Sequence, residues 1–60
     1  MNIKELKTKA FEHMNEHQEI RKEHIDSGGI YDCDYYHFHT NMYNYWRGMY
    51  NGCIELEKTN

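Results

Sequence analysis

The feature that most constrains the fold is the break Ser27-Gly28-Gly29, which lies near the midpoint of a 60-residue chain without proline. Each side of the break is long enough for one continuous helix. Gly28 is expected to adopt the left-handed conformation that ends a helix, because glycine has no Cβ to disfavour it. The break therefore predicts two helices joined by a short turn, an antiparallel hairpin.

The first segment is predicted to be a helix from about residue 3 to 26. Asn2 followed by Glu5 has the spacing of a capping box, which pairs free N–H groups at a helix start. Apolar residues recur at about 100° per residue and define one face. These residues are Ile3, Leu6, Ala10, Met14 and Ile25. The opposite face carries a row of glutamates, interpreted as a solvated surface.

The second helix is predicted over about residues 32–57, after a turn at 27–31. Asp32 or Asp34 is expected to cap it and to complement its dipole. Its apolar face advances in steps of three and four residues through Tyr35, Phe38, Met42, Trp46, Met49, Cys53 and Leu56, and is widened by Tyr43, Tyr50 and Ile54. A strand over 30–39 is the competing prediction, since tyrosine and isoleucine favour sheets, but the alternation there is poor.

These patterns predict an all-α protein with a single domain, residues 1–60, built as a two-helix antiparallel hairpin. Between Tyr35 and Ile54 the only formally charged residue is Arg47. A single hairpin would leave more aromatic surface exposed than monomers usually tolerate. We therefore expect a homodimeric four-helix bundle or a higher oligomer.

Composition excludes several classes of protein. No run of 18 or more apolar residues is present, so no membrane span is expected. The first residues lack the apolar core of a signal peptide, which predicts a cytoplasmic location. A net charge of −3 argues against direct nucleic-acid binding, which normally requires a basic patch.

The two cysteines, Cys33 and Cys53, are predicted to be free thiols. On one helix they would lie roughly 30 Å apart at 1.5 Å per residue, too far for a disulfide. Reduced thiols are typical of cytosolic proteins. A CxxC pair, the usual sign of a cysteine zinc site, is absent.

Histidine is unusually frequent, with five copies in 60 residues. His13 and His17 have the i, i+4 spacing of helical zinc ligands, and His24 follows one heptad later on the same apolar face. We interpret the three as a polar seam that hydrogen-bonds to tyrosine hydroxyls of the second helix and fixes register. Protonation near about pH 5–6 would then loosen the bundle. The alternative is a metal-stabilised structural module that uses His13, His17 and a histidine of a second chain; no cofactor is otherwise expected.

Aromatic and arginine side chains dominate interface energies, so they are the candidate partner-binding or ligand-binding residues. The set is Tyr43, Trp46, Arg47, Tyr50 and His39. The Arg47 guanidinium can stack on an aromatic face or bind a phosphate or carboxylate. This leaves open an oligomeric sponge that sequesters a nucleotide signal between subunits.

Gly48 and Gly52 share one face of the second predicted helix, where small residues let a backbone or a flat ligand approach closely. Two interpretations are open: a docking surface on the outside of the hairpin, or a close helix crossing within an oligomer. Catalysis is not expected, because the one serine, Ser27, lies in the turn and no Gly-rich phosphate loop follows a strand.

The stretch Tyr45-Trp46-Arg47-Gly48, followed by Gly52 in a short Asn- and Tyr-rich chain, resembles small bacteriophage-encoded accessory proteins of the early, anti-defence kind. The resemblance carries over no functional residue. It implies an inhibitor in the host-cell cytoplasm that binds a host protein or a host signalling molecule. The leading prediction is thus a non-catalytic, phage-type inhibitor of a host defence protein; the nucleotide sponge and the metal-stabilised module are the alternatives.

Overall fold

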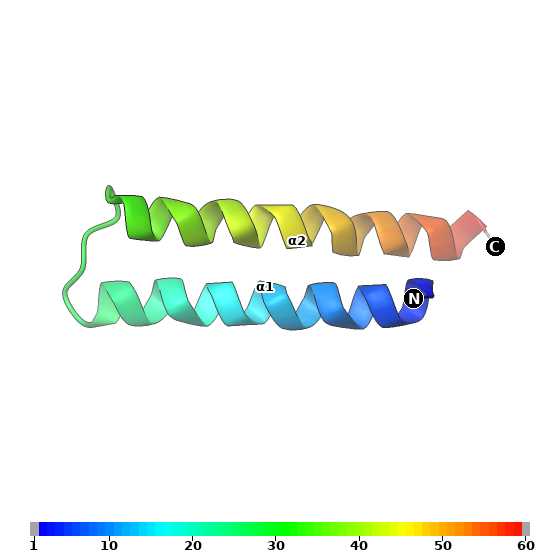
Figure 1. The fold of residues 1–60 in the computed structure, drawn as a ribbon, viewed down its shortest axis with the longest axis horizontal. Coiled ribbons are helices and arrows are strands. Elements are labelled where there is room, and N and C mark those ends of the chain that lie inside the picture. The colour runs from blue at the N-terminus through cyan, green and yellow to red at the C-terminus, as the bar shows by residue number, and fades with distance from the viewer. Residues whose placement is uncertain (1, 60) are drawn as a thin grey trace.

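The computed structural model describes residues 2–59, which form two helices packed side by side in opposite directions (Figure 1). Helix α1 spans Ile3–Asp26 and helix α2 spans Asp34–Thr59. The hairpin is a rod with extents of 45 × 16 × 15 Å. The start of α1 and the end of α2 lie at the same end of this rod (Figure 1). The predicted all-helical hairpin is confirmed. The alternative of a strand over 30–39 is wrong, since the described chain contains no strand.

Helix α1 begins with the predicted cap. The Asn2 side-chain oxygen accepts a hydrogen bond from the Glu5 N–H at 2.8 Å. The return bond differs from a standard capping box, because the Asn2 side-chain amide donates to the Glu5 carboxylate at 3.4 Å. The cap satisfies one of the backbone donors that a helix start leaves unpaired.

Helix α1 ends in a Schellman motif at the glycine pair, and the prediction that a left-handed Gly28 ends the helix is confirmed. Gly28 has a φ of 93°, and its N–H donates to the Ile25 carbonyl at 3.0 Å. The Gly29 N–H donates to the His24 carbonyl at 2.8 Å. These two bonds pair carbonyls that the helix end would otherwise leave free.

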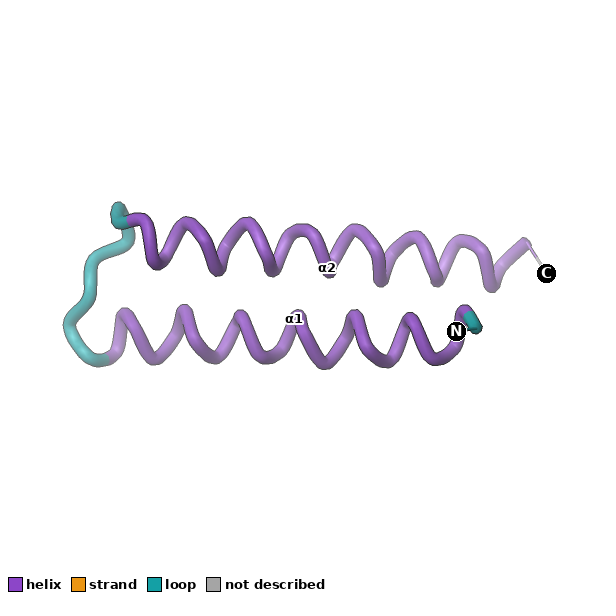
Figure 2. Tube along the Cα trace, in the orientation of Figure 1, coloured by secondary structure: helices purple, strands orange, loops and turns teal. Residues whose placement is uncertain are grey.

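Helix α2 starts two residues later than predicted, at Asp34, and the cap is Cys33 in place of an aspartate. The Cys33 carbonyl accepts from the His37 N–H at 3.0 Å, and its sulfur accepts from the Tyr36 N–H at 3.4 Å. Asp32 instead pairs with the His37 ring at 2.9 Å. The loop between the helices (teal in Figure 2) therefore runs to Cys33.

The two helices contact each other along rows of side chains spaced three and four residues apart. On α1 the row is Ile3, Leu6, Ala10, His13, His17, Ile20 and His24, and on α2 it is Tyr36, His39, Tyr43, Trp46, Tyr50 and Cys53. This is the spacing of a coiled-coil seam. Only Ala10 and Cys53 in the described chain are buried, at 0% and 3% exposure. The hairpin therefore has almost no closed core of its own.

The apolar face predicted for the second helix is partly wrong in register. Trp46 and Cys53 do lie against α1, but Tyr35, Phe38 and Leu56 are 53%, 56% and 54% exposed. The row of α2 that contacts α1, here called the inner row, is shifted by one residue from the predicted face, because tyrosines repeat at seven-residue intervals from Tyr36 and contact α1. The predicted face thus mixes members of two neighbouring rows.

Candidate functional site

The most prominent surface feature is an unbroken apolar row on the outside of α2, here called the outer stripe. It consists of Tyr35, Phe38, Met42, Tyr45, Met49, Gly52 and Leu56. These positions again advance by three and four residues, one residue away from the inner row. Phe38 and Tyr45 are each 56% exposed. No member carries a formal charge, so the stripe is an apolar surface along the length of the helix.

Three of the predicted binding residues are half-buried and contact α1. The Trp46 ring stacks on His13 with a centroid distance of 4.3 Å and an interplanar angle of 20°. Tyr43 lies beneath the Arg21 guanidinium, whose central carbon is 4.7 Å from the ring centroid. Tyr50 meets Phe11 at 5.7 Å. Each of these rings therefore uses one side to hold the hairpin together.

The two other predicted binding residues are not brought together. Arg47 is exposed, and within residues 2–59 it makes no hydrogen bond, ion pair or cation–π contact. His39 turns toward α1 and pairs with His17. His37, which the sequence places near both, is exposed and pairs with Asp32. A pocket made by Arg47 with these histidines is therefore not formed by one hairpin.

The predicted histidine seam lies where expected, between the helices, but its partners differ from the prediction. His17 and His39 face each other with 2.8 Å between their Nδ1 atoms. His24 reaches the Ile30 carbonyl through Nε2 at 2.8 Å, and His13 stacks on Trp46. The expected bonds to tyrosine hydroxyls are not found in the described residues.

The environment of His39 favours its neutral form. Burial lowers its pKa below the usual value of 6.5, and the neighbouring His17 lowers it further, while Glu16 acts in the opposite direction. A neutral imidazole pair needs one Nδ1 to donate and the other to accept. The hydrogen bond between the two rings is therefore expected to form when both imidazoles are neutral.

The metal alternative gains no third ligand from the hairpin. Among residues 2–59 no three histidine, cysteine, aspartate or glutamate side chains form a group that could hold a metal ion. His13 is occupied by its stack on Trp46, and His17 by its bond to His39. The two candidates thus have separate partners.

The loop brings a thiol and an imidazole together, which sequence reasoning missed. The Cys33 sulfur lies 3.4 Å from His24 Nε2 and also 3.4 Å from the Ile30 carbonyl oxygen. Both cysteines are free thiols, as predicted. Because the sulfur also accepts the Tyr36 N–H, the contacts join the end of α1 to the start of α2.

Arg21 is the second feature that the sequence analysis missed. Its guanidinium donates to the Thr40 hydroxyl at 3.2 Å and to the Gln18 side-chain oxygen. It also lies over Tyr43 and, at 5.7 Å, over Tyr36. The available signal was its position: Arg21 follows His17 by four residues and so shares the inner face of α1.

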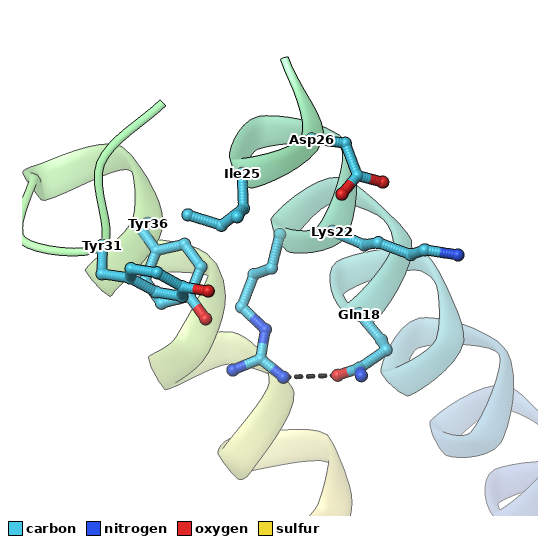
Figure 3. Close-up of a pocket in the computed structure, with 7 residues that line it drawn as sticks. Gln18, Lys22, Ile25, Asp26, Tyr31 and Tyr36 are labelled. Atoms are coloured by element: carbon cyan, nitrogen blue, oxygen red, sulfur yellow. Dashed lines mark hydrogen bonds between the residues drawn. The ribbon is translucent and has the colours of Figure 1, made fainter. Parts of the chain in front are cut away.

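The Arg21 side chain forms part of a pocket of about 230 Å³ beside the loop. Figure 3 shows Tyr31 and Tyr36 together on one wall, with their phenol oxygens at the same end, and Lys22 and Asp26 on the opposite side. The dashed line in the figure marks the hydrogen bond that the Arg21 guanidinium donates to the Gln18 side-chain oxygen. Ile25 completes the lining.

The remaining predicted features are the glycine face of α2 and the expected lack of a membrane span. Gly48 and Gly52 are exposed, and a Cβ built on either would have no neighbour within 4 Å, so the hairpin itself gives no close approach to this face. Neither described helix combines the length and the apolar character needed to cross a membrane.

Comparisons with models of known protein families, with characterised proteins and with solved structures give no match. The functional assignment therefore rests on the geometry of the two helices and of the surfaces described above.

Proposed function

We propose that this protein is a non-catalytic binding protein that associates with itself through the outer stripe of α2. The observation that carries the proposal is the stripe itself: seven positions at coiled-coil spacing, of which the large side chains Tyr35, Phe38, Tyr45 and Leu56 are more than half exposed, while Met42 and Met49 are half-buried. A second surface then binds a partner protein.

The small core supports a need for association. The described hairpin buries only Ala10 and Cys53, and it fully buries no large side chain. Burial of apolar surface contributes about 25 cal/mol per Å² removed from water, and short chains commonly gain the missing burial from an oligomer. A partner on the outer stripe would cover Phe38, Tyr45 and Leu56, which are each more than half exposed.

A second copy of the chain is the partner that the stripe fits. Its three-and-four spacing matches that of the row with which α2 already contacts α1, so an identical helix can pack against it in the same manner. Two hairpins joined in this way form a four-helix bundle. A symmetric dimer also places the same stripe on both sides of the interface, as a two-fold axis requires.

Local contacts support a binding role over a catalytic one. Ser27 donates from its hydroxyl to the Glu23 and His24 carbonyls, at 2.8 and 3.2 Å. No base lies against this hydroxyl in the described structure. The Cys33 sulfur caps α2, and the adjoining His24 ring holds the Ile30 carbonyl.

Light scattering coupled to size exclusion tests the self-association. We expect wild type to have at least twice the chain mass of 7.4 kDa. The double variant Phe38→Glu/Tyr45→Glu should shift to the single-chain mass, since a buried carboxylate in an apolar interface is costly. The charge-matched control Asn44→Glu/Asn51→Glu, at exposed positions seven residues apart, should keep the wild-type mass. A single-chain mass for wild type, or the same mass for both doubles, would refute the proposal.

For the partner protein, the resemblance to phage accessory proteins implies a host protein, bound to inhibit it. Arg47 is exposed and uncommitted within residues 2–59, which suits an interface anchor. Capture from bacterial lysate with wild type, Arg47→Glu and the charge-conserving Arg47→Lys checks this role. We expect Arg47→Glu to lose a partner that wild type retains; identical partner sets would remove Arg47 from the interface.

A further inference from the structure

We propose that the pocket around Arg21 binds the phosphate group of a small phosphate monoester. The pocket lies beside the loop and includes Tyr31, Tyr36 and Lys22. It is distinct from the outer stripe, because Thr40, which holds Arg21, and Phe38, in the stripe, are two residues apart on α2 and do not share a face.

The first argument is the charge balance of Arg21. The side chain is half-buried, and within residues 2–59 no carboxylate forms an ion pair with it. Its partners are the neutral oxygens of Thr40 and Gln18 and the ring faces of two tyrosines. A guanidinium removed from water is favoured by a counter-ion, and an anion in the pocket would supply one.

The second argument is the supply of hydrogen-bond donors. A guanidinium carries five N–H groups, and Thr40 and Gln18 use one each. Arg21 Nε is buried without a partner in the described structure, and the donors left for a ligand are the second N–H groups of the two terminal nitrogens. The planar fork of an arginine matches the oxygens of a phosphate in two parallel bonds.

The third argument is the arrangement of the pocket walls. Figure 3 shows the phenol oxygens of Tyr31 and Tyr36 at one end of the same wall, where both can donate to a bound oxyanion. Lys22 lines the opposite side, with its ammonium pointing away from the tyrosines, and the one acidic lining residue is Asp26. The lining therefore has an excess of positive charge within a chain of net charge −3.

The pocket volume limits how much of a ligand it can hold. A volume of about 230 Å³ is below the usual range for a whole drug-sized ligand, which begins near about 300 Å³. A phosphate group fits inside, while the rest of the molecule would extend outward past Tyr31, a residue that is 63% exposed. An aromatic base on the ligand could stack there, whereas a bare sugar could not.

NMR titration of ¹⁵N-labelled protein with AMP, ribose 5-phosphate and inorganic phosphate tests the site, with each sample matched in ionic strength by sodium chloride. We expect saturable shifts of the Arg21 Nε–H and of the Tyr31 and Tyr36 amides, with a Kd of about 1 mM or tighter. Tighter binding of AMP than of ribose 5-phosphate would identify a nucleotide; equal binding would identify a sugar phosphate.

Arg21→Gln should weaken binding at least about tenfold, since hydrogen bonds from a charged donor are the strong ones. Arg47→Gln, which removes the other arginine of the chain, should leave the titration unchanged. Arg21→Lys keeps the charge but not the fork and should bind with intermediate strength. If Arg21→Gln alters the helical circular dichroism, the Tyr31→Leu variant, at a 63% exposed position, replaces it and should lose the preference for AMP.

The proposal is overturned if no signal of the pocket saturates, if sodium chloride alone reproduces the shifts, or if Arg47→Gln weakens binding as much as Arg21→Gln does. Self-association is read from mass and phosphate binding from these shifts, so either can fail without the other.

Discussion

His17 on α1 and His39 on α2 face each other with their Nδ1 atoms 2.8 Å apart. At this distance one nitrogen must donate a proton and the other must accept it. A proton on the accepting Nδ1 would place N–H against N–H, whereas a second proton on the donor ring would go to its Nε2 and leave the bond intact. The two helices are therefore joined at their middle by a hydrogen bond that exists only while one of the two Nδ1 atoms is unprotonated and can accept.

Acidification should destabilise the hairpin through this pair. Burial and His17 lower the pKa of His39 below 6.5, Glu16 opposes them, and Tyr35 and Phe38 pack against the ring at 4.8 and 5.1 Å. The unfolded chain then binds more protons than the folded one, so stability is full above pH 6.5 and falls as the pH drops through and below it. Thermal unfolding at several pH values between about 7.5 and 5.5 measures the effect.

The matched variants for this prediction are His39→Gln and His37→Gln. His39→Gln should reduce the dependence on pH, because the half-buried titrating group is gone. His37→Gln changes an exposed histidine that pairs with Asp32 and should leave the wild-type slope over this range. A melting temperature that does not move with pH in wild type would contradict the account of the pair.

The Cys33 cap predicts an unusual effect of a conservative change. A hydroxyl is a better acceptor for a helix N–H than a thiol, so Cys33→Ser should raise the free energy of unfolding by roughly 0.5 kcal/mol, and Cys33→Ala should lower it by a similar amount. Urea unfolding measures both. The control Cys53→Ser places the same hydroxyl at a site that is 3% exposed, where it should destabilise by about 1 kcal/mol or more. Loss of stability in Cys33→Ser would argue against sulfur capping.

The glycines predict opposite effects of one substitution. Gly28→Ala should lower the free energy of unfolding by about 1 kcal/mol, because an L-residue is disfavoured at a φ of 93° in this left-handed region. Gly48→Ala should raise it by roughly 0.5–1 kcal/mol, since the site is helical and a Cβ there has no neighbour within 4 Å. Denaturant unfolding of both variants tests this.

A destabilising Gly48→Ala would have a specific meaning. It would show that another helix backbone approaches the glycine face in the folded assembly, as the interpretation of Gly48 and Gly52 as a close helix crossing within an oligomer predicts. The same variant measured at low concentration, where association is reversed, separates the helix preference from such a contact.

The parts of the fold that the sequence predicts are those with local chemistry. Asn2 is recognised as a cap because Glu5 has the right spacing, and Gly28 as a helix end because few residues accept its conformation. The register of α2 was not predictable in this way. Tyr35 and Tyr36 are adjacent and equally apolar, so two neighbouring rows compete for α1, and contacts with α1 decide between them.

The missed residues share a different reason. Cys33 was not expected as a cap because thiols are weak acceptors, and its contact with His24 depends on how the loop folds back. The inward position of Arg21 was not predicted, because charged side chains on a helix usually face water. Its importance follows from Tyr36 and Tyr43, which lie on the other helix and provide the ring faces.

The most direct test of the central claim is an isotope-filtered NOE experiment on a mixture of labelled and unlabelled chains. The account predicts intermolecular contacts between the methyl groups of Met42 or Met49 and the rings of Phe38 or Tyr45 in another copy. A well-folded sample at millimolar concentration without intermolecular contacts, or with contacts only at Phe11 of α1, would contradict it.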